Sequence, residues 1–156
     1  MQLSVLLQVE RGPEVDITQR ENAAPRASRR TGLLLAGDAI SFLVFAAIGR
    51  RSHSENGAIA DVALTAAPFL LAWLVVATLA GALRGDLLLA PRRLLTRTAL
   101  AWLLAWPLGL GLRALLLGRE IPGSFAIVVG VANTVLLLGW RGVAAWMVTR
   151  RKTSTD

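Results

Sequence analysis

Cysteine is absent from this chain, and histidine and lysine each occur once, as His53 and Lys152. Without thiols the chain has no structural disulfide, no thiolate metal ligand and no cysteine nucleophile. A single imidazole excludes a histidine-rich metal site, and we expect no metal and no other cofactor. The remaining polar residues form neither a carboxylate pair nor a nucleophile beside a base. The sequence therefore predicts a protein that is not an enzyme and has no catalytic residue.

Apolar residues are abundant and gathered into long runs. They make up 54% of the 156 residues, and the mean hydropathy is +0.57, whereas soluble domains have roughly 45–50% apolar residues even with Gly counted. Runs of this length are typical of membrane-spanning helices. The chain is short enough for one domain. We therefore expect an all-α polytopic membrane protein.

The apolar runs divide the chain into four spans. They cover about residues 33–49, 62–83, 94–117 and 123–146, within a transmembrane domain of residues 31–149. Residues 1–30 form a polar leader with scattered charges, which indicates a disordered segment. Residues 150–156 form a polar tail. The sequence predicts a bundle of four transmembrane helices between these two segments.

The basic residues predict the orientation of the bundle. The net charge is +7, but the charges lie at the ends of apolar runs instead of on one soluble face, so we exclude nucleic acid as a partner. One side of the predicted bundle holds nine basic residues, namely Arg26, Arg29, Arg30, Arg84, Arg92, Arg93, Arg150, Arg151 and Lys152. The other side holds three, Arg50, Arg51 and Arg119. The positive-inside rule then places both termini in the cytoplasm and the protein in the cytoplasmic membrane, where basic residues meet anionic headgroups.

A carboxylate, Asp38, lies inside the first apolar run. Such a charge costs about 2.5–3.5 kcal/mol at the centre of a span, so it requires a partner or a proton. Arg97 and Arg141 lie at a similar depth in the third and fourth spans, and we expect an intramembrane charge cluster of Asp38, Arg97 and Arg141. Asp38 is either half of a structural ion pair or a group that binds a proton or a coupling ion.

A second set of charged residues lies toward the opposite face. Asp61 and Arg113 fall at a similar depth, and the sequence predicts that they pair there. Together with Arg50 and His53 in the first loop, they form a candidate outer-face cluster. Arg113 either binds an anionic substrate or headgroup, or extends to the interface. Asn133, near the middle of the fourth span, is predicted to form a hydrogen bond between helices.

Several short stretches resemble one known membrane family. They are Gly37-Asp38, Ile48-Gly-Arg-Arg-Ser-His53, Ala66-Ala-Pro-Phe69, Pro107-Leu-Gly-Leu-Gly-Leu-Arg113, Ile121-Pro-Gly-Ser-Phe125 and Gly139-Trp-Arg141. In this order they are similar to the bacterial and archaeal family called domain of unknown function 3054, over about residues 33–147. The resemblance implies a small multi-helix membrane protein and supplies no activity.

Two classes of function remain. The first is a small transporter, channel or lipid-binding module, in which the lipid bilayer and anionic lipid headgroups are the partners and several copies assemble. The second is a non-catalytic accessory or assembly subunit of a larger membrane complex. Bound lipids or stoichiometric foreign chains would distinguish the two classes.

Overall fold

The computed structural model describes residues 14–52, 59–118 and 120–153. Every regular element in these ranges is helical, in the order α2 (Glu14–Ser52), α3 (Ile59–Leu79), the short 3-10 helix η1 (Gly85–Leu89), α4 (Pro91–Leu117) and α5 (Gly123–Thr153). Each α-helix contains an apolar stretch long enough to cross a membrane, 20–28 residues in length. At 1.5 Å per residue these stretches measure about 30–42 Å. The predicted all-α fold with four spans is confirmed.

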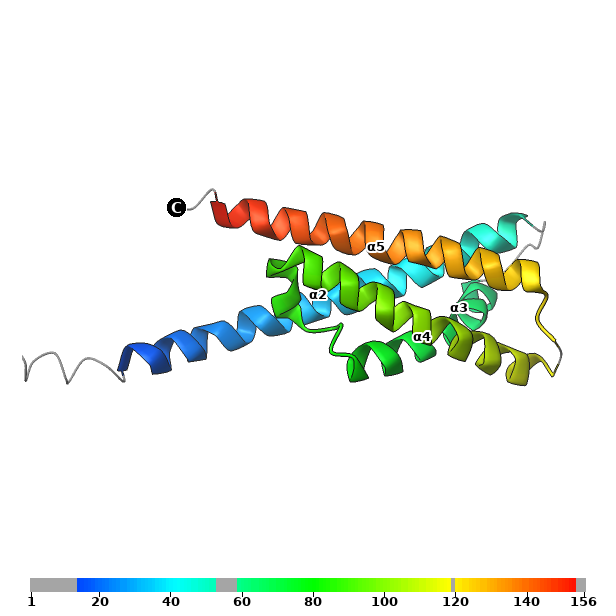
Figure 1. The fold of residues 1–156 in the computed structure, drawn as a ribbon, viewed down its shortest axis with the longest axis horizontal. Coiled ribbons are helices and arrows are strands. Elements are labelled where there is room, and N and C mark those ends of the chain that lie inside the picture. Colours follow the sequence, from blue (N-terminus) through cyan, green and yellow to red (C-terminus); the bar gives the residue numbers. More distant parts are fainter. Residues whose placement is uncertain (1–13, 53–58, 119, 154–156) are drawn as a thin grey trace, which may run out of the picture.

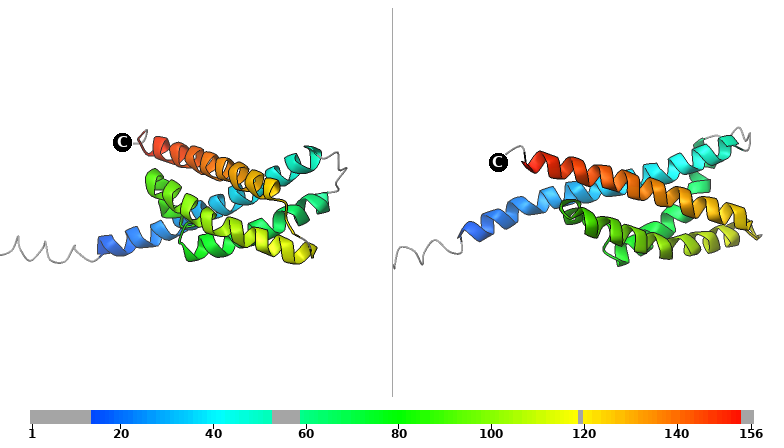
Figure 2. Two further views of the ribbon diagram at one scale, coloured as in Figure 1. Left: turned by 45° about the vertical axis from the view of Figure 1, so that its right-hand side comes forward. Right: turned by 45° about the horizontal axis from the view of Figure 1, so that its top comes forward.

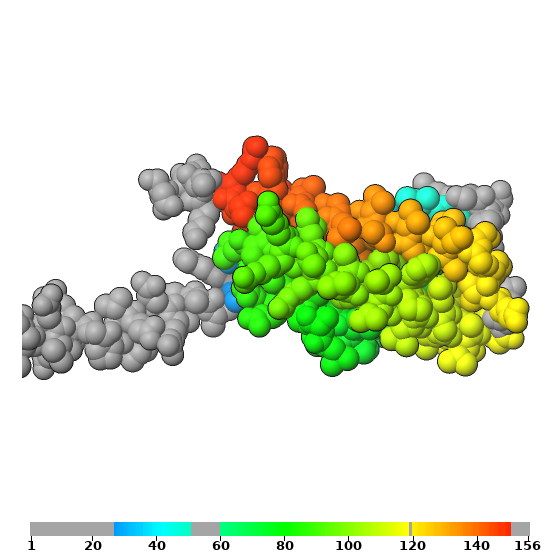
Figure 3. Space-filling model, in the orientation of Figure 1, coloured from blue at the N-terminus to red at the C-terminus, as the bar shows by residue number. Residues whose placement is uncertain are grey.

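Consecutive spans run in opposite directions, so the beginning of α2 and the end of α5 lie at the same end of the bundle (Figure 1). Both helices extend past their neighbours there, and the other two views show the same arrangement (Figure 2). We call this the terminal end. The opposite end, where α2 ends and α5 begins, is the loop end. On one face of the molecule α4 and α5 lie side by side (Figure 3).

Helix α2 begins at Glu14, well before the predicted start of the first span at residue 33. Residues 14–30 were expected to be disordered, but they are helical in the structure. Arg and Ala, which have high helix propensity, make up seven of these 17 residues and outweigh Pro25, and the segment continues directly into the apolar run. The whole helix has 39 residues and is about 58 Å long, nearly twice the roughly 30 Å of hydrocarbon in a bilayer. Its first part therefore lies outside the membrane.

Helix α3 ends at Leu79 and not near residue 83 as predicted, because Gly81 closes it. Gly81 has a φ of 63°, which a glycine adopts without strain. Its N–H bonds to the carbonyl of Thr78, and the N–H of Ala82 bonds to the carbonyl of Ala77. These two bonds form a Schellman motif, which satisfies the last carbonyls of the helix. The turn leaves the carbonyl of Ala82 facing the interior of the bundle.

The turn and η1 pack directly on the backbone of α2. The N–H of Gly85 donates to Thr31 Oγ1 at 3.1 Å. A Cβ at Gly85 would lie 2.5 Å from the carbonyl oxygen of Ala27, so only glycine fits. Helix α4 begins at Pro91. A proline fits the first turn of a helix because the backbone N–H that it lacks would have no partner within the helix there. The connection between α3 and α4 is thus fixed against the first span.

Aromatic side chains fill the middle of the bundle. Phe42 of α2 packs against Trp73 of α3 and Trp102 of α4, with ring centroids 6.4 and 5.6 Å away. Trp73 and Trp102 meet edge to face at 6.3 Å, a favoured aromatic geometry. All three side chains are at most 3% exposed. These three rings form an aromatic layer that joins α2, α3 and α4.

Candidate functional site

The carboxylate of Asp38 is fully buried, and it accepts hydrogen bonds from three residues on two other spans. Trp73 Nε1 donates to Oδ2 at 2.9 Å, and Trp140 Nε1 donates to Oδ1 at 3.0 Å. Arg141 donates from Nε to Oδ1 at 2.9 Å and from Nη2 to Oδ2. The guanidinium therefore binds the carboxylate through two parallel bonds, the strongest arrangement for this pair of groups.

Arg141 is also fully buried, and its remaining contacts extend to α4 and to the turn after α3. Nη1 donates to the carbonyl of Ala82 and to Thr98 Oγ1, both at 2.9 Å. The guanidinium carbon lies 5.0 Å from the centroid of the Trp73 ring. We call Asp38, Trp73, Ala82, Thr98, Trp140 and Arg141 the Asp38 cluster. It joins all four spans, and none of its buried side-chain polar atoms lacks a partner.

Gly37 allows Trp140 to reach the carboxylate. A Cβ at Gly37 would lie 2.0 Å from Trp140 Cζ2, inside the volume of the indole ring. The short sequences Gly37-Asp38 and Gly139-Trp-Arg141 therefore form one site, although about a hundred residues separate them. In hydrocarbon a buried charge pair is stable only when further hydrogen bonds offset its desolvation. The two indoles and the Thr98 hydroxyl supply those bonds.

Arg97, predicted to belong to the same charge cluster, does not join it. Its side chain is exposed, and Nη1 donates to the carbonyl of Gly81 at 3.4 Å. The next residue, Thr98, faces the interior. One residue along a helix turns the side chain by about 100°, so Arg97 has the predicted depth but lies on the wrong face of α4.

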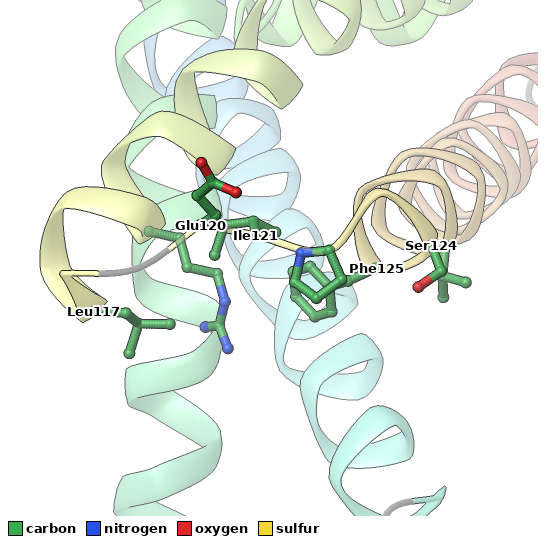
Figure 4. Close-up of a pocket in the computed structure, with 8 residues that line it drawn as sticks. Leu117, Glu120, Ile121, Ser124 and Phe125 are labelled. Atoms are coloured by element: carbon green, nitrogen blue, oxygen red, sulfur yellow. The ribbon is translucent and has the colours of Figure 1, made fainter.

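A second candidate site lies at the loop end, where two hollows share Arg113, Phe125 and Val128. One hollow, of about 280 Å³, receives side chains from all four spans, among them Arg50 of α2 and Thr65 of α3. The other, of about 520 Å³, extends between the end of α4 and the start of α5. Figure 4 shows the second hollow, with Leu117 on one side, Ser124 and Phe125 on the other, and Glu120 and Ile121 on the connection between them. We call the two hollows together the arginine vestibule.

The position of Arg113 in the arginine vestibule is set by packing between three helices. A Cβ at Gly109 would lie 2.6 Å from the ring of Phe69, so α3 and α4 approach closely there. Phe69 packs against Phe125 of α5, with ring centroids 6.3 Å apart. The guanidinium carbon of Arg113 lies 4.9 Å from the centroid of Phe125, within the range of a cation–π contact. The charge is thereby held against an apolar wall.

The predicted outer-face cluster is brought together only in part. Asp61 contacts Arg50, with 3.5 Å between Oδ2 and Nη2, and not Arg113 as expected. Arg50 ends the first span and Asp61 lies in the first turn of the second. These adjacent helix ends place Asp61 beside Arg50 instead of Arg113. Arg50 and Arg113 line the same hollow. His53 lies outside the residues that the structure describes.

Asn133 is fully buried, and among the described residues it makes no hydrogen bond to another helix. Its Nδ2 donates to the carbonyl of Val129 on its own helix at 3.0 Å. Its Oδ1 has no hydrogen-bond partner among the described residues. The prediction of a polar contact between helices is therefore wrong, because the amide donates to the carbonyl four residues earlier on its own helix.

Two indole groups also join α4 to α5 through hydrogen bonds. Trp102 Nε1 donates to the carbonyl of Gly130 at 3.1 Å, and Trp106 Nε1 donates to that of Ala126 at 3.0 Å. Beside them lies an apolar groove of about 480 Å³, which Leu103, Ile127 and other aliphatic side chains line. The indole N–H groups are satisfied, so this groove offers apolar contact alone.

The indole donors of the Asp38 cluster were not predicted from the sequence. Neither Trp73 nor Trp140 was predicted to donate to Asp38, because tryptophan in a span has many uses. The available signal was the sequence Gly139-Trp-Arg141, in which an indole precedes the basic residue at the depth of Asp38. Thr98 carried no comparable signal.

Comparison with known proteins gives one match. The family model described as "Protein of unknown function (DUF3054)" matches residues 35–144. No curated protein and no solved structure matches the chain. All six stretches that carry the resemblance contribute to the Asp38 cluster, the arginine vestibule or the packing beside them. The matched residues cover more than half of the chain, so this protein belongs to the DUF3054 family of multi-helix membrane proteins.

Proposed function

We propose that this protein is a non-catalytic lipid-binding module, in which the arginine vestibule holds the anionic headgroup of a lipid. The observation that carries this proposal is one hollow that receives Arg50, Arg113 and the aromatic rings of Phe45 and Phe125. Guanidinium groups recognise phosphate and carboxylate oxygens through paired hydrogen bonds. The adjacent rings suit the apolar part of an amphiphile.

The packing of the interior favours binding over conduction. A path from the arginine vestibule through the bundle would have to pass Phe42, Trp73 and Trp102, which are in mutual contact. Beyond them the Asp38 carboxylate already accepts four hydrogen bonds. We assign the Asp38 cluster a structural role, which is to hold the four spans in one arrangement, and not a role as a carrier of protons or ions.

The orientation that we propose places both termini in the cytoplasm and the arginine vestibule at the outer face of the cytoplasmic membrane. Basic side chains at the terminal end support it, since Arg29, Arg92, Arg93 and Arg150 are exposed there. The native chain has no cysteine, so a single introduced thiol is unambiguous. In intact cells we expect an impermeant maleimide to label Ser124→Cys and not a cysteine in place of Arg92. The reverse pattern would contradict this orientation.

Titration of the detergent-purified protein with short-chain lipids tests the proposed function. Native mass spectrometry gives the fraction bound for dioctanoyl phosphatidic acid and for dioctanoyl phosphatidylcholine. We expect the anionic lipid to bind more tightly, and Arg113→Gln to weaken that binding about tenfold or more, as the loss of a hydrogen bond to a charged group does. Arg93→Gln, at the opposite end, is the matched control. Equal affinity for both lipids, or no effect of Arg113→Gln, would refute the proposal.

One observation favours a second candidate, an accessory subunit of a membrane complex. The groove between α4 and α5 is apolar and faces outward, and large side chains beside it are exposed, including Leu100, Leu103 and Val131. A helix of another chain would fit such a surface by close packing. A foreign chain that co-purifies in fixed stoichiometry would support this alternative.

A further inference from the structure

Glu120 lines the larger hollow of the arginine vestibule, and a second acidic residue, Asp61, contacts one of the vestibule's arginines without lining either hollow. Asp61 Oδ2 lies 3.5 Å from Arg50 Nη2, at the outer limit of a hydrogen bond. The side chains of Arg50 and Asp61 are 21% and 47% exposed. A long contact between partly hydrated groups is weak, because water competes for both partners. The Asp61 carboxylate can therefore leave Arg50 at low cost.

The second arginine approaches from a different span and is fixed differently. Arg113 lies on α4 and stacks on Phe125, and it lines the same 280 Å³ hollow as Arg50. In the part of the chain that the structure describes, Asp61 contacts Arg50, and its carboxylate is held at the first turn of α3. Its backbone there accepts a hydrogen bond from Thr65 Oγ1 at 2.9 Å. An anion that is not tethered can contact both guanidinium groups at once.

The number of acceptor oxygens selects the class of anion. A phosphate monoester has three terminal oxygens and a charge of about −1.5 to −2 at neutral pH. It can accept from two planar guanidinium groups that approach from different directions. A carboxylate has two oxygens and one charge, and a phosphate diester has one charge. Two arginines in one hollow therefore favour a phosphate with at least three terminal oxygens, namely a monoester such as phosphatidic acid or free inorganic phosphate.

We propose that Asp61 is an internal competitor for the ligand, which a phosphate monoester displaces from Arg50 in order to bridge Arg50 and Arg113. This proposal rests on the proposed function of the arginine vestibule and adds the ligand class and a means of regulating affinity. The resting contact between Asp61 and Arg50 keeps one guanidinium in place for the ligand. Because the contact between Asp61 and Arg50 is weak, we expect it to lower the affinity for the ligand only slightly.

The test compares binding of dioctanoyl phosphatidic acid to four proteins in the same detergent: wild type, Asp61→Asn, Arg50→Gln and the double variant. Asp61→Asn removes the competitor, and we expect binding about two- to fivefold tighter, which matches the strength of exposed ion pairs. Arg50→Gln should weaken binding. The double variant should bind like Arg50→Gln alone, because Asp61 acts only through Arg50. Asp61→Ser is a second neutral variant, and thermal unfolding confirms that each variant is folded.

The outcomes separate this inference from the proposed function. Unchanged or weaker binding by both Asp61→Asn and Asp61→Ser, while Arg113→Gln still loses affinity, would overturn the competition and leave the site intact. If Arg113→Gln binds like wild type, the proposed function itself fails. Tighter binding of phosphatidic acid than of phosphatidylglycerol, a diester, supports the ligand class, and equal binding overturns it. Inorganic phosphate that binds as tightly as phosphatidic acid supports the chemistry and identifies soluble phosphate as the source.

Discussion

Replacement of Asp38 by Asn is the most informative perturbation of the fold. Each carboxylate oxygen accepts two hydrogen bonds: Oδ1 from Trp140 and from Arg141 Nε, and Oδ2 from Trp73 and from Arg141 Nη2. Whichever way the new amide is turned, its NH₂ group faces two N–H donors. The variant therefore loses two hydrogen bonds and leaves a buried guanidinium without its counter-ion. Removing one partner of a buried pair costs about 3–5 kcal/mol.

Thermal unfolding in mild detergent, followed by tryptophan fluorescence, measures this cost. A loss of that size lowers Tm by roughly 6–20 °C, at 2–4 °C per kcal/mol. The double variant Asp38→Asn with Arg141→Gln removes the uncompensated charge, and we expect it to be less destabilised than the sum of the two single variants by about 1–3 kcal/mol. Combination of Asp38→Asn with Arg97→Gln should give no such recovery.

The exposed pair of Arg84 and Asp86 is the matched control. Its two hydrogen bonds are both 3.2 Å long, and its side chains are 65% and 58% exposed. The same two changes, Arg to Gln and Asp to Asn, should cost at most about 1 kcal/mol there. Asp38→Asn with wild-type stability, or strictly additive losses with Arg141→Gln, would refute the account of the Asp38 cluster.

Two further predictions concern local contacts. Gly37→Ala should displace the Trp140 ring and lower the free energy of unfolding by about 1–3 kcal/mol. Gly32→Ala is the control, because an added Cβ meets nothing within 4 Å there, and it should be neutral or slightly stabilising. Equal thermal stability of the two variants would contradict the close contact between Gly37 and Trp140. The hydrogen bond from Arg84 lowers the pKa of Asp86 below its ordinary value of 3.8, so this carboxylate adds stability above pH 3.8 that is lost as pH falls through the lowered pKa. Wild type and Asp86→Asn should therefore differ by less than about 1 kcal/mol above that pH and converge in acid; a difference that grows in acid would contradict this assignment.

Hydropathy alone predicted the fold, because a span must satisfy its backbone internally and be apolar along its length. The same property limits what the sequence can say about packing. A helix that is apolar on all sides carries little information about which face turns inward. From depth and charge sign alone, both Arg97 and Arg141 were predicted to lie near Asp38. The structure shows that Arg141 is on the inner face of α5 and Arg97 on the outer face of α4.

The remaining differences have local causes. Residues 14–30 are as highly charged as a disordered leader, but in the structure the helix of the first span continues back through them to Glu14. Gly81 ended α3 earlier than hydropathy indicated, since the turn that follows is itself apolar. Asp61 was predicted to pair with Arg113 because the two lie at similar depth, whereas in the structure it contacts Arg50 at the adjacent helix end. Contacts set by helix rotation and by turns were not visible in the spacing of the residues.

The most direct test of the proposed function is the native mass of the protein released from its own membranes with bound lipids retained. We expect one kind of chain, alone or as several copies, that carries a phosphate-bearing anionic lipid. We also expect that Arg113→Gln loses this lipid while Arg93→Gln keeps it. A complex with a stoichiometric foreign chain and no retained anionic lipid would contradict the account and identify the protein as an accessory subunit.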